Sequence, residues 1–168
     1  MKNLKKLIII TGPSGVGKGT VVKEILEKNE NIWLSVSATT RKPREGEIEG
    51  ENYYFFSEEK FKEMIDKELF LEWAQFAGNY YGTPLDKVKK KIDEGFTVLL
   101  EIEVEGAKQI KKVFPRALSI FLLPPNKVEL ERRIRNRGTE KEESINKRLD
   151  RANFEIEASN EFDFSLIN

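Results

Sequence analysis

The sequence predicts an α/β domain built on a parallel sheet, and three features of the 168-residue chain support this class. The aliphatic run from Leu7 to Ile10 is followed by a glycine-rich loop and then by helical periodicity up to residue 26. Two further apolar runs, 96–103 and 118–123, read as strands buried on both faces. Because helix-like segments separate these runs, we expect parallel strands flanked by helices.

Composition limits the chemistry that the chain can perform. Lys plus Arg and Asp plus Glu both number 29, so the net charge is zero and no extended basic surface exists for a nucleic acid. The chain has neither Cys nor His, which excludes disulfides, thiol catalysis and histidine acid–base chemistry. No stretch approaches the roughly 18 apolar residues of a membrane span. We therefore expect one cytoplasmic domain that binds small charged molecules, without nucleic-acid or membrane partners.

The loop after the first strand is the most informative segment. It reads Gly12-Pro13-Ser14-Gly15-Val16-Gly17-Lys18-Gly19-Thr20 and leads into a helix that starts near Lys18. Glycines let backbone amides converge on phosphate oxygens, the helix directs its positive dipole end at the same point, and Lys18 adds an ammonium group. The spacing matches a P-loop, so the whole segment is a candidate triphosphate site. A glycine-rich turn that binds nothing is the alternative.

The segment departs from the general P-loop pattern at one position. Ser or Thr normally follows the lysine and helps to hold Mg²⁺, but here Gly19 does so and the hydroxyl belongs to Thr20. Thr20 is therefore the candidate metal ligand.

Residues 33–84 are expected to form a small antiparallel lobe inserted into this domain. The predicted elements are strands at 33–37, 53–56, 69–76 and 80–83, a helix at 58–66 capped by Ser57, and a turn at 77–79. The loop 38–47 carries Arg41 and Arg44, which either grip a dianionic group or form a solvated basic loop.

Polar residues among the apolar ones of the lobe are further candidates for a binding site. They are Ser37, Tyr53, Glu72, Tyr81 and Thr83. Taken singly, ordinary edge-strand polarity would explain each of them.

The second half of the chain returns to alternating helices and strands. A charged helix at 85–94 ends at Gly95 and precedes the strand 96–103. Glu101 and Glu103 lie at the carboxyl end of that strand, where they either hold Mg²⁺ or a water molecule, or cap the next helix.

The last third is predicted to be helical up to a final strand. Helices at 126–137 and from 139 to about 158 both begin with capping-box spacing, and residues 164–167 form the last strand. The corner between these helices is rich in arginine: Arg132, Arg133, Arg135, Arg137, Arg148 and Arg151. These arginines either form a solvated helix face or belong to a lid for phosphoryl transfer.

Five segments in one order give the chain a resemblance to guanylate kinases over essentially its whole length. They are GPSGVGKGT at 12–20, SVSATTRKPREGE at 35–47, FLEWAQFAGNYYGTP at 70–84, LLEIEVEGA at 99–107 and RGTEKEESINKRL at 137–149. The resemblance implies one P-loop nucleotide kinase domain, 1–168, that converts ATP and GMP to ADP and GDP with Mg²⁺, with dGMP as a further acceptor, in nucleotide salvage and GTP supply. Its implied parts are a core (1–32, 85–125, 159–168), a GMP-binding lobe (33–84), and a lid with flanking helices (126–158).

The same resemblance implies roles for individual residues. The guanine-reading residues would be Ser37, Glu72, Thr83 and Glu103, with Ser37 and Thr83 donating to O6. The GMP phosphate would be held by Arg41, Arg44, Tyr53 and Tyr81. The catalytic group would be Lys18, Arg41 and the lid arginines Arg133, Arg137 and Arg148. Asn168 lies where the family contacts the adenine of ATP.

The chain also departs from the family pattern. Glu103 and Glu105 stand where the family often has Asp and Gln, and Gly19 stands where many members have Ser. The family usually continues beyond Asn168 with a helix that packs on the core.

Two other functions remain open at this point. A kinase for another nucleoside monophosphate would share the P-loop and lid and differ in the acceptor lobe. A guanylate-kinase-like scaffold domain would bind phosphopeptides through that lobe, but such domains typically have degraded P-loops, whereas Gly12, Gly17 and Lys18 are all present here. Sequence does not distinguish a monomer from a dimer.

Overall fold

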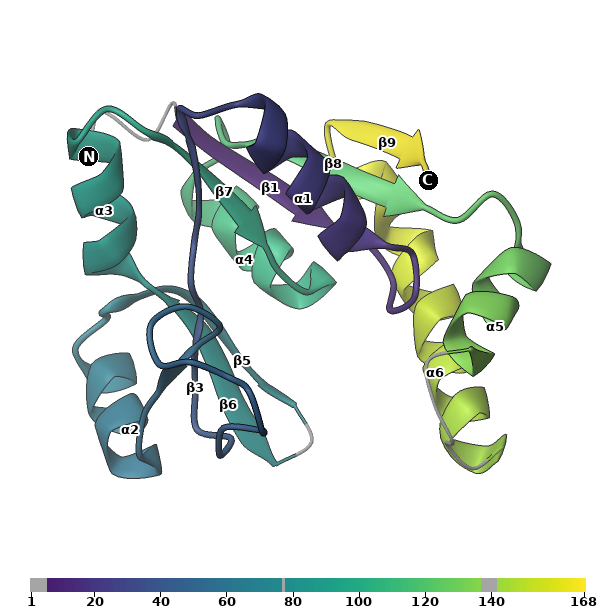
Figure 1. Cartoon of the computed structure of the whole chain (residues 1–168), viewed down its shortest axis with the longest axis horizontal. Helices are drawn as coiled ribbons and strands as arrows, with labels where there is room; N and C mark the ends of the chain where they lie inside the picture. Colours follow the sequence, from purple (N-terminus) through teal and green to yellow (C-terminus); the bar gives the residue numbers. More distant parts are fainter. Residues whose placement is uncertain (1–5, 77, 137–141) are drawn as a thin grey trace.

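A parallel sheet of five strands forms the centre of the molecule, in the order β2-β7-β1-β8-β9. The computed structural model describes residues 6–76, 78–136 and 142–168. The strands are β1 (Leu7–Thr11), β2 (Ile32–Leu34), β7 (Thr97–Glu101), β8 (Leu118–Leu123) and β9 (Phe164–Ile167). β1 lies in the middle and pairs in parallel with β7 on one side and β8 on the other (Figure 1). The predicted α/β class with a parallel core is therefore confirmed.

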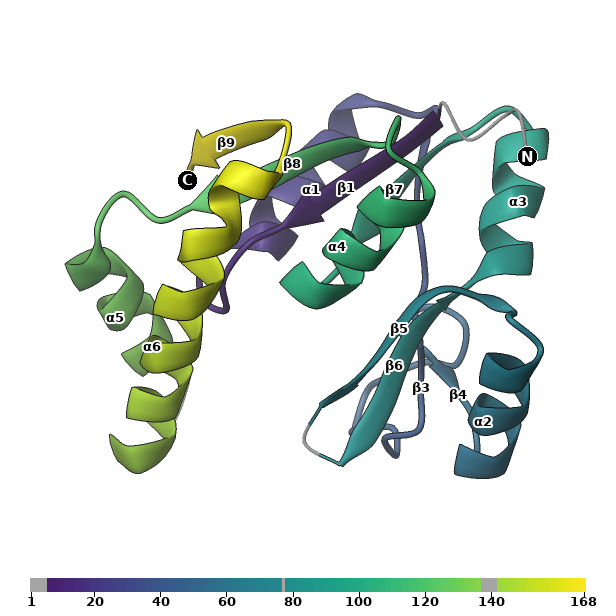
Figure 2. The same cartoon turned by 180° about the vertical axis from the view of Figure 1, so that it is seen from behind.

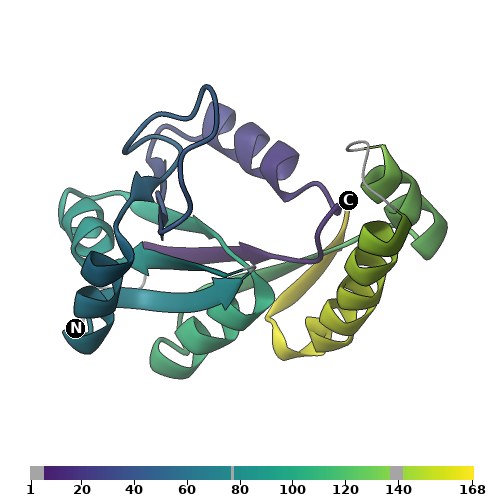
Figure 3. The same ribbon diagram turned by 90° about the horizontal axis from the view of Figure 1, so that it is seen from below.

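Helices cover both faces of this sheet. α1 (Lys18–Lys28) lies on one face and α4 (Val104–Val113) on the other (Figure 3). α3 (Leu85–Asp93) packs into the same apolar cluster as α4. Because successive side chains of a strand point to opposite faces, Ile9 packs toward α3 and α4, whereas Ile10 packs toward α1. Both isoleucines are buried, so β1 is fixed between two apolar layers and the loop that follows it starts from a rigid point.

A second, four-stranded sheet forms the inserted lobe, in the order β4-β3-β6-β5. Its elements are β3 (Ala38–Thr39), β4 (Tyr54–Phe55), α2 (Glu58–Asp66), β5 (Phe70–Phe76) and β6 (Asn79–Pro84). α2 begins as predicted, since the Ser57 side chain accepts a hydrogen bond from the Lys60 backbone N–H. Phe61 of α2 stacks on Phe70 and Tyr80 and gives the lobe its own apolar centre. Figure 2 shows α2 beside the strands of this sheet.

Three expectations about the lobe were wrong. The sheet is mixed rather than antiparallel, because β3 and β4 are joined by a long loop instead of a hairpin and pair in parallel. Residues 38–39 form β3 rather than the start of a loop. The strand expected at 33–37 within the lobe is β2, which ends at Leu34 and pairs with β7 of the core sheet.

Two helices project from the core on the side of the molecule away from α3 (Figure 1). α5 (Lys127–Arg135) and α6 (Glu142–Glu157) pack through a small apolar cluster, and α6 continues through a 3₁₀ helix (Ala158–Glu161) toward β9. Asn126 caps α5 by accepting from the Glu129 backbone N–H. The predicted helix end at Arg137 and start at Thr139 lie outside the described residues. Within the described chain, no helix has the length and apolar character needed to cross a membrane.

Candidate active site

The P-loop runs from the end of β1 to the first turn of α1. Gly17 occupies the N-cap of α1 with a left-handed φ of 94°, and a Cβ at this position would lie 2.6 Å from Nδ2 of Asn168. The left-handed conformation requires glycine, and the close approach shows that Asn168 lies against the loop. Nζ of Lys18 donates to the carbonyl oxygens of Gly12 at 2.7 Å and Pro13 at 3.3 Å, so the ammonium group lies on the loop itself.

Side chains from α5, α6 and the chain end converge on this loop. Nη1 of Arg133 donates to the carbonyl of Val16 at 3.1 Å, and Nδ2 of Asn168 donates to the same oxygen at 2.8 Å. Nη2 of Arg148 donates to Oγ of Ser14 at 2.9 Å. Arg133, Arg148 and Asn168, all predicted from the sequence, therefore gather at the P-loop. Arg137 lies outside the described residues.

The donor set near the loop suits a magnesium ion that arrives with a nucleotide. Thr20 is exposed in the first turn of α1, and Oε1 of Glu101 lies 4.0 Å from the position that a Cβ on Gly19 would take. Hydroxyl and carboxylate oxygens are ligands that Mg²⁺ accepts, and the ion usually keeps waters and phosphate oxygens as its remaining ligands. Across the described residues, no three or more acidic side chains cluster into a protein-only metal site.

A cavity of about 500 Å³ lies where the lobe faces the core and the P-loop lysine. Lys18 lines it together with most of the predicted acceptor-site residues, namely Ser37, Tyr53, Glu72, Tyr81 and Glu103. The other predicted acceptor residues, Arg41, Arg44 and Thr83, are not part of its lining. Ser35 and Phe76 also line it although neither was predicted from the sequence, and Arg151, predicted only as one of several arginines between two helices, lines it too. A serine and a phenylalanine in ordinary strand contexts carry no local signal, and Arg151 is one of many arginines on α6.

Glu72 is the buried carboxylate of this cavity. Its side chain on β5 accepts a hydrogen bond of 2.6 Å from Oγ1 of Thr83 on β6, and the residue is only 7% exposed. Burial raises the pKa of Glu72 to about 7, against a smaller opposing effect from the Thr83 hydrogen bonds. The other side of the carboxylate lies against α4, since a Cβ on Gly106 would come within 2.5 Å of Oε2.

Arg41 and Arg44 do not act as an equal pair. The Arg41 guanidinium makes a bidentate ion pair with Glu47, at 3.0 and 2.8 Å, and lies 5.3 Å from the ring centroid of Tyr53. Arg44 contributes its backbone N–H to Glu47 at 2.7 Å, and its side chain is exposed. The hydrogen bonds from Arg41 and from the backbone of Arg44 lower the pKa of Glu47 to about 2. Tyr81 lies edge-on to Tyr53, with ring centroids 6.3 Å apart.

Glu103 occupies the N-cap position of α4 but makes no capping hydrogen bond through its side chain. Its carboxylate instead pairs with Arg151 of α6, with Oε2 and Nη2 3.5 Å apart. Of the two alternatives left open for this residue, helix capping is therefore not what the side chain does.

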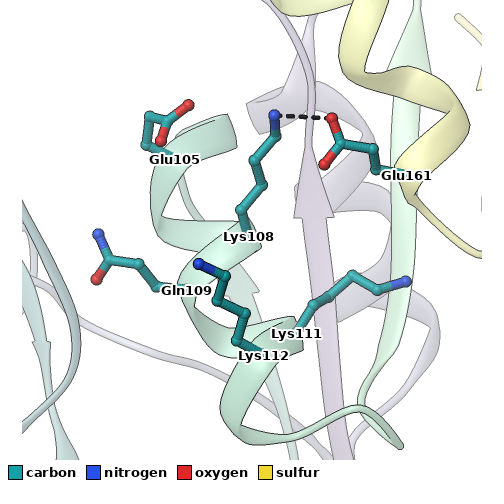
Figure 4. Close-up of a pocket in the computed structure, with 6 residues that line it drawn as sticks. All are labelled: Glu105, Lys108, Gln109, Lys111, Lys112 and Glu161. Carbon is teal, nitrogen blue, oxygen red and sulfur yellow. Dashed lines mark ion pairs between the residues drawn. The ribbon is translucent and has the colours of Figure 1, made fainter.

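A second hollow, of about 470 Å³, lies on the outer face of α4 (Figure 4). Its lining residues are Glu105, Lys108, Gln109, Lys111, Lys112 and Glu161. Lys108 is already paired with Glu161 at 2.8 Å. Gln109 makes two hydrogen bonds with the backbone of Trp73 on β5, at 3.2 and 2.9 Å, and so joins α4 to the lobe. This face of α4 connects core and lobe.

A P-loop at the centre of a parallel sheet, an inserted lobe with a polar cavity, and helices that bring arginines to the loop define a P-loop nucleotide kinase. The family model for guanylate kinase matches residues 4–168. The chain is 79% identical to a guanylate kinase of Prochlorococcus marinus strain MIT 9312, covering 100% of this chain and 91% of that protein. It is 56% identical over 163 residues to a guanylate kinase of Trichormus variabilis, covering 97% of this chain and 82% of that protein. The chain therefore belongs to the guanylate kinase family.

The fold comparison agrees with the sequence comparison. A crystal structure of guanylate kinase from Anaplasma phagocytophilum superposes with a TM-score of 0.75 at 33% identity, covering 96% of this chain and 76% of that one.

Proposed function

We propose that the chain transfers the γ-phosphoryl group of ATP to GMP, giving ADP and GDP, and that dGMP is a second acceptor. Family membership supports the reaction. The observation that carries the acceptor assignment is the buried carboxylate of Glu72, which lies in the same cavity as Lys18 of the P-loop.

Glu72 suits guanine because of the hydrogen-bonding pattern of the base. Guanine presents two adjacent donors, N1–H and the 2-amino group, and an ionised carboxylate accepts both. Adenine has an acceptor at N1 and no 2-amino group, so its binding would set acceptor against acceptor and leave a buried charge unpaired. A site that reads hydrogen bonds in this way can reject the wrong analogue by about 10⁴-fold.

The contacts to guanine O6, to the 2-amino group and to the acceptor phosphate are assigned from the side chains near the cavity. The single hydroxyl hydrogen of Thr83 is directed at Glu72 in this structure, so we assign guanine O6 to Ser37 rather than to both hydroxyls. Glu103 faces the same cavity and is assigned to the 2-amino group. We assign the acceptor phosphate to Arg41, Tyr53 and Tyr81, with Arg44 as an outer charge.

The transfer itself needs alignment and charge neutralisation rather than a general base. The second pKa of a phosphate monoester is about 6, so the GMP phosphate is already ionised near neutral pH. Lys18 and the loop amides hold the donor phosphates, and Arg133, Arg148 and, by family resemblance, Arg137 neutralise charge on the moving group. Mg²⁺ carried by ATP would supply further charge neutralisation, and Thr20 and Glu101 are the residues that would help to hold it.

A coupled assay of ADP release tests this assignment. With ATP and Mg²⁺, we expect activity on GMP and dGMP and none above background on AMP, UMP or TMP. Glu72→Gln should lose much of the preference for GMP over AMP, because the amide offers one acceptor and one donor. Glu63→Gln, an exposed carboxylate on α2 of the same lobe, is the matched control. A wild-type protein that phosphorylates AMP as well as GMP would contradict the assignment.

A further inference from the structure

Arg151 joins the three parts of the molecule that surround the cavity, namely α6, the lobe and the core. It projects from α6, its guanidinium carbon lies 4.5 Å from the ring centroid of Phe76 on β5 of the lobe, and Nη2 lies 3.5 Å from Oε2 of Glu103 at the start of α4 in the core. Arg151, Phe76 and Glu103 all line the cavity.

Glu155, one helical turn further along α6, fixes the position of this guanidinium group by a hydrogen bond. Nε of Arg151 donates to Oε1 of Glu155 at 2.9 Å. Glu155 is only 6% exposed, and its second oxygen is buried without a hydrogen-bond partner. Rotating Arg151 away would leave a buried carboxylate without its cation, which is costly. Arg151 is therefore held over the cavity.

This arrangement has a consequence for Glu103. The Glu103 side chain is 57% exposed and makes no capping bond, so without a partner it would sample several rotamers. The ion pair to Arg151 restrains Oε2 and leaves Oε1 able to accept a further hydrogen bond. Arg151 thus selects one orientation of a carboxylate that faces the acceptor cavity.

We propose that Arg151 is a positioning residue that holds Glu103 for the 2-amino group of the acceptor base, and that the preference for 2-aminopurine nucleotides depends on it. This inference rests on the proposed function and deepens it. Arg151 does not touch the reacting phosphates in this proposal and acts only through Glu103, with Phe76 supporting the plane of the guanidinium.

Inosine monophosphate is the probe that separates this role from a structural one, because it keeps N1–H and O6 of GMP but lacks the 2-amino group. In Arg151→Ala we expect the ratio of kcat/KM for GMP to that for inosine monophosphate to fall about tenfold, within the range of coupling between residues in contact. The loss should lie in KM for GMP, with KM for ATP unchanged. Lys147→Ala is the control, since that exposed lysine on the same helix pairs with Glu143 and does not line the cavity.

A double-mutant cycle with Glu103→Ala tests whether Arg151 acts through Glu103. In the Glu103→Ala background, Arg151→Ala should leave the GMP to inosine monophosphate ratio nearly unchanged. A fall in the ratio of equal size in both backgrounds would overturn the proposal, as would a wild-type ratio in Arg151→Ala.

Arg151→Lys provides a second variant if the alanine variant does not fold, with thermal unfolding as the check. Lysine keeps the charge but not the fork that contacts Glu155 and Glu103 together, so we expect the ratio to fall about threefold. An unchanged ratio would overturn the inference. A wild-type protein that is inactive on GMP would overturn both the proposed function and the inference, whereas active wild-type protein with unchanged variants overturns the inference alone.

Discussion

Among single residues, Lys18 has its role set most directly by its surroundings. Its ammonium group donates to two carbonyl oxygens of the P-loop. It therefore lies at the loop whose backbone N–H groups would bind the donor phosphates. In Lys18→Ala we expect kcat to fall by about 10²- to 10³-fold, as for loss of one preorganised donor to the transition state. GMP affinity should change little, because the charge faces the donor rather than the acceptor.

Steady-state kinetics together with a direct GMP titration check the Lys18 prediction. Lys23→Ala on the exposed side of α1 is the matched control and should retain wild-type turnover. Full activity in Lys18→Ala would refute the P-loop mechanism.

Arg41 and Arg44 are expected to differ, although the sequence presents them as a pair. Arg41 is oriented by its bidentate pair with Glu47 and by Tyr53, whereas the Arg44 side chain is exposed. Arg41→Ala should weaken GMP binding by about 2 kcal/mol, the loss of a hydrogen bond to a charged group. Arg44→Ala should cost less, because solvent and salt screen an exposed charge. Calorimetric titration with GMP at two salt concentrations would show this order, and equal losses would contradict it.

At the scale of elements, the sequence was sufficient where the signals are local. β1, the P-loop and α1 follow one another directly between residues 7 and 28, so the apolar run, the glycines and the helical periodicity identify them together. Ser57 and Asn126 gave the starts of α2 and α5 for the same reason, and both cap as expected. These elements depend little on what lies far away in the chain.

Elements whose identity depends on distant partners were predicted less well. Whether β2 belongs to the lobe or to the core is decided by its pairing with β7, more than sixty residues later, and the sequence of β2 does not encode that choice. The parallel pairing of β3 and β4 has the same origin. The cavity residues Phe76 and Arg151 come from separate elements, so only the folded chain shows that they meet.

The limits of α4 were not predicted from the sequence, because Gly106 lies inside this helix and weakens the helical signal. A glycine inside a helix lowers its propensity by about 1 kcal/mol relative to alanine. The structure shows its purpose, since a Cβ on Gly106 would lie 2.5 Å from Oε2 of Glu72 and 3.1 Å from its Cδ. The glycine lets α4 approach the buried carboxylate of the lobe.

Gly106→Ala should therefore impair acceptor binding more than it impairs folding. The new methyl group would displace the Glu72 carboxylate from Thr83, while the gain in helix propensity of about 1 kcal/mol offsets part of the strain. We expect KM for GMP to rise about tenfold or more, with the unfolding midpoint close to wild type. Lys112→Ala on the exposed side of α4 is the control. A wild-type KM for GMP would show that Glu72 has room to move.

For the molecule as a whole, Glu72 links the acceptor site to the free energy of unfolding. Its pKa in the folded protein is raised to about 7 from an ordinary value of 4.5, mainly by burial. Between these values the folded state binds more protons than the unfolded state, so stability falls as pH rises from about 4.5 to 7. Above pH 7 the ionised carboxylate costs about 3 kcal/mol, at 1.36 kcal/mol for each pKa unit. GMP would relieve this cost by donating to the carboxylate.

Removing the negative charge of Glu72 should therefore stabilise the protein without GMP only at pH values at which Glu72 would be ionised. Glu72→Gln keeps an oxygen that accepts from Thr83, so its unfolding free energy in urea should match wild type near pH 4.5 and exceed it by about 3 kcal/mol at pH 8. The lowered pKa values of Glu47 and Glu129, about 2 in each case, act in the opposite direction and below pH 4.5, outside this window. Buried Glu155, whose pKa is also raised, remains in both proteins and cancels in the comparison. Glu63→Gln should show no such growth with pH. A Glu72→Gln effect of the same size at pH 4.5 and pH 8 would mean that packing, rather than the buried charge, sets the difference.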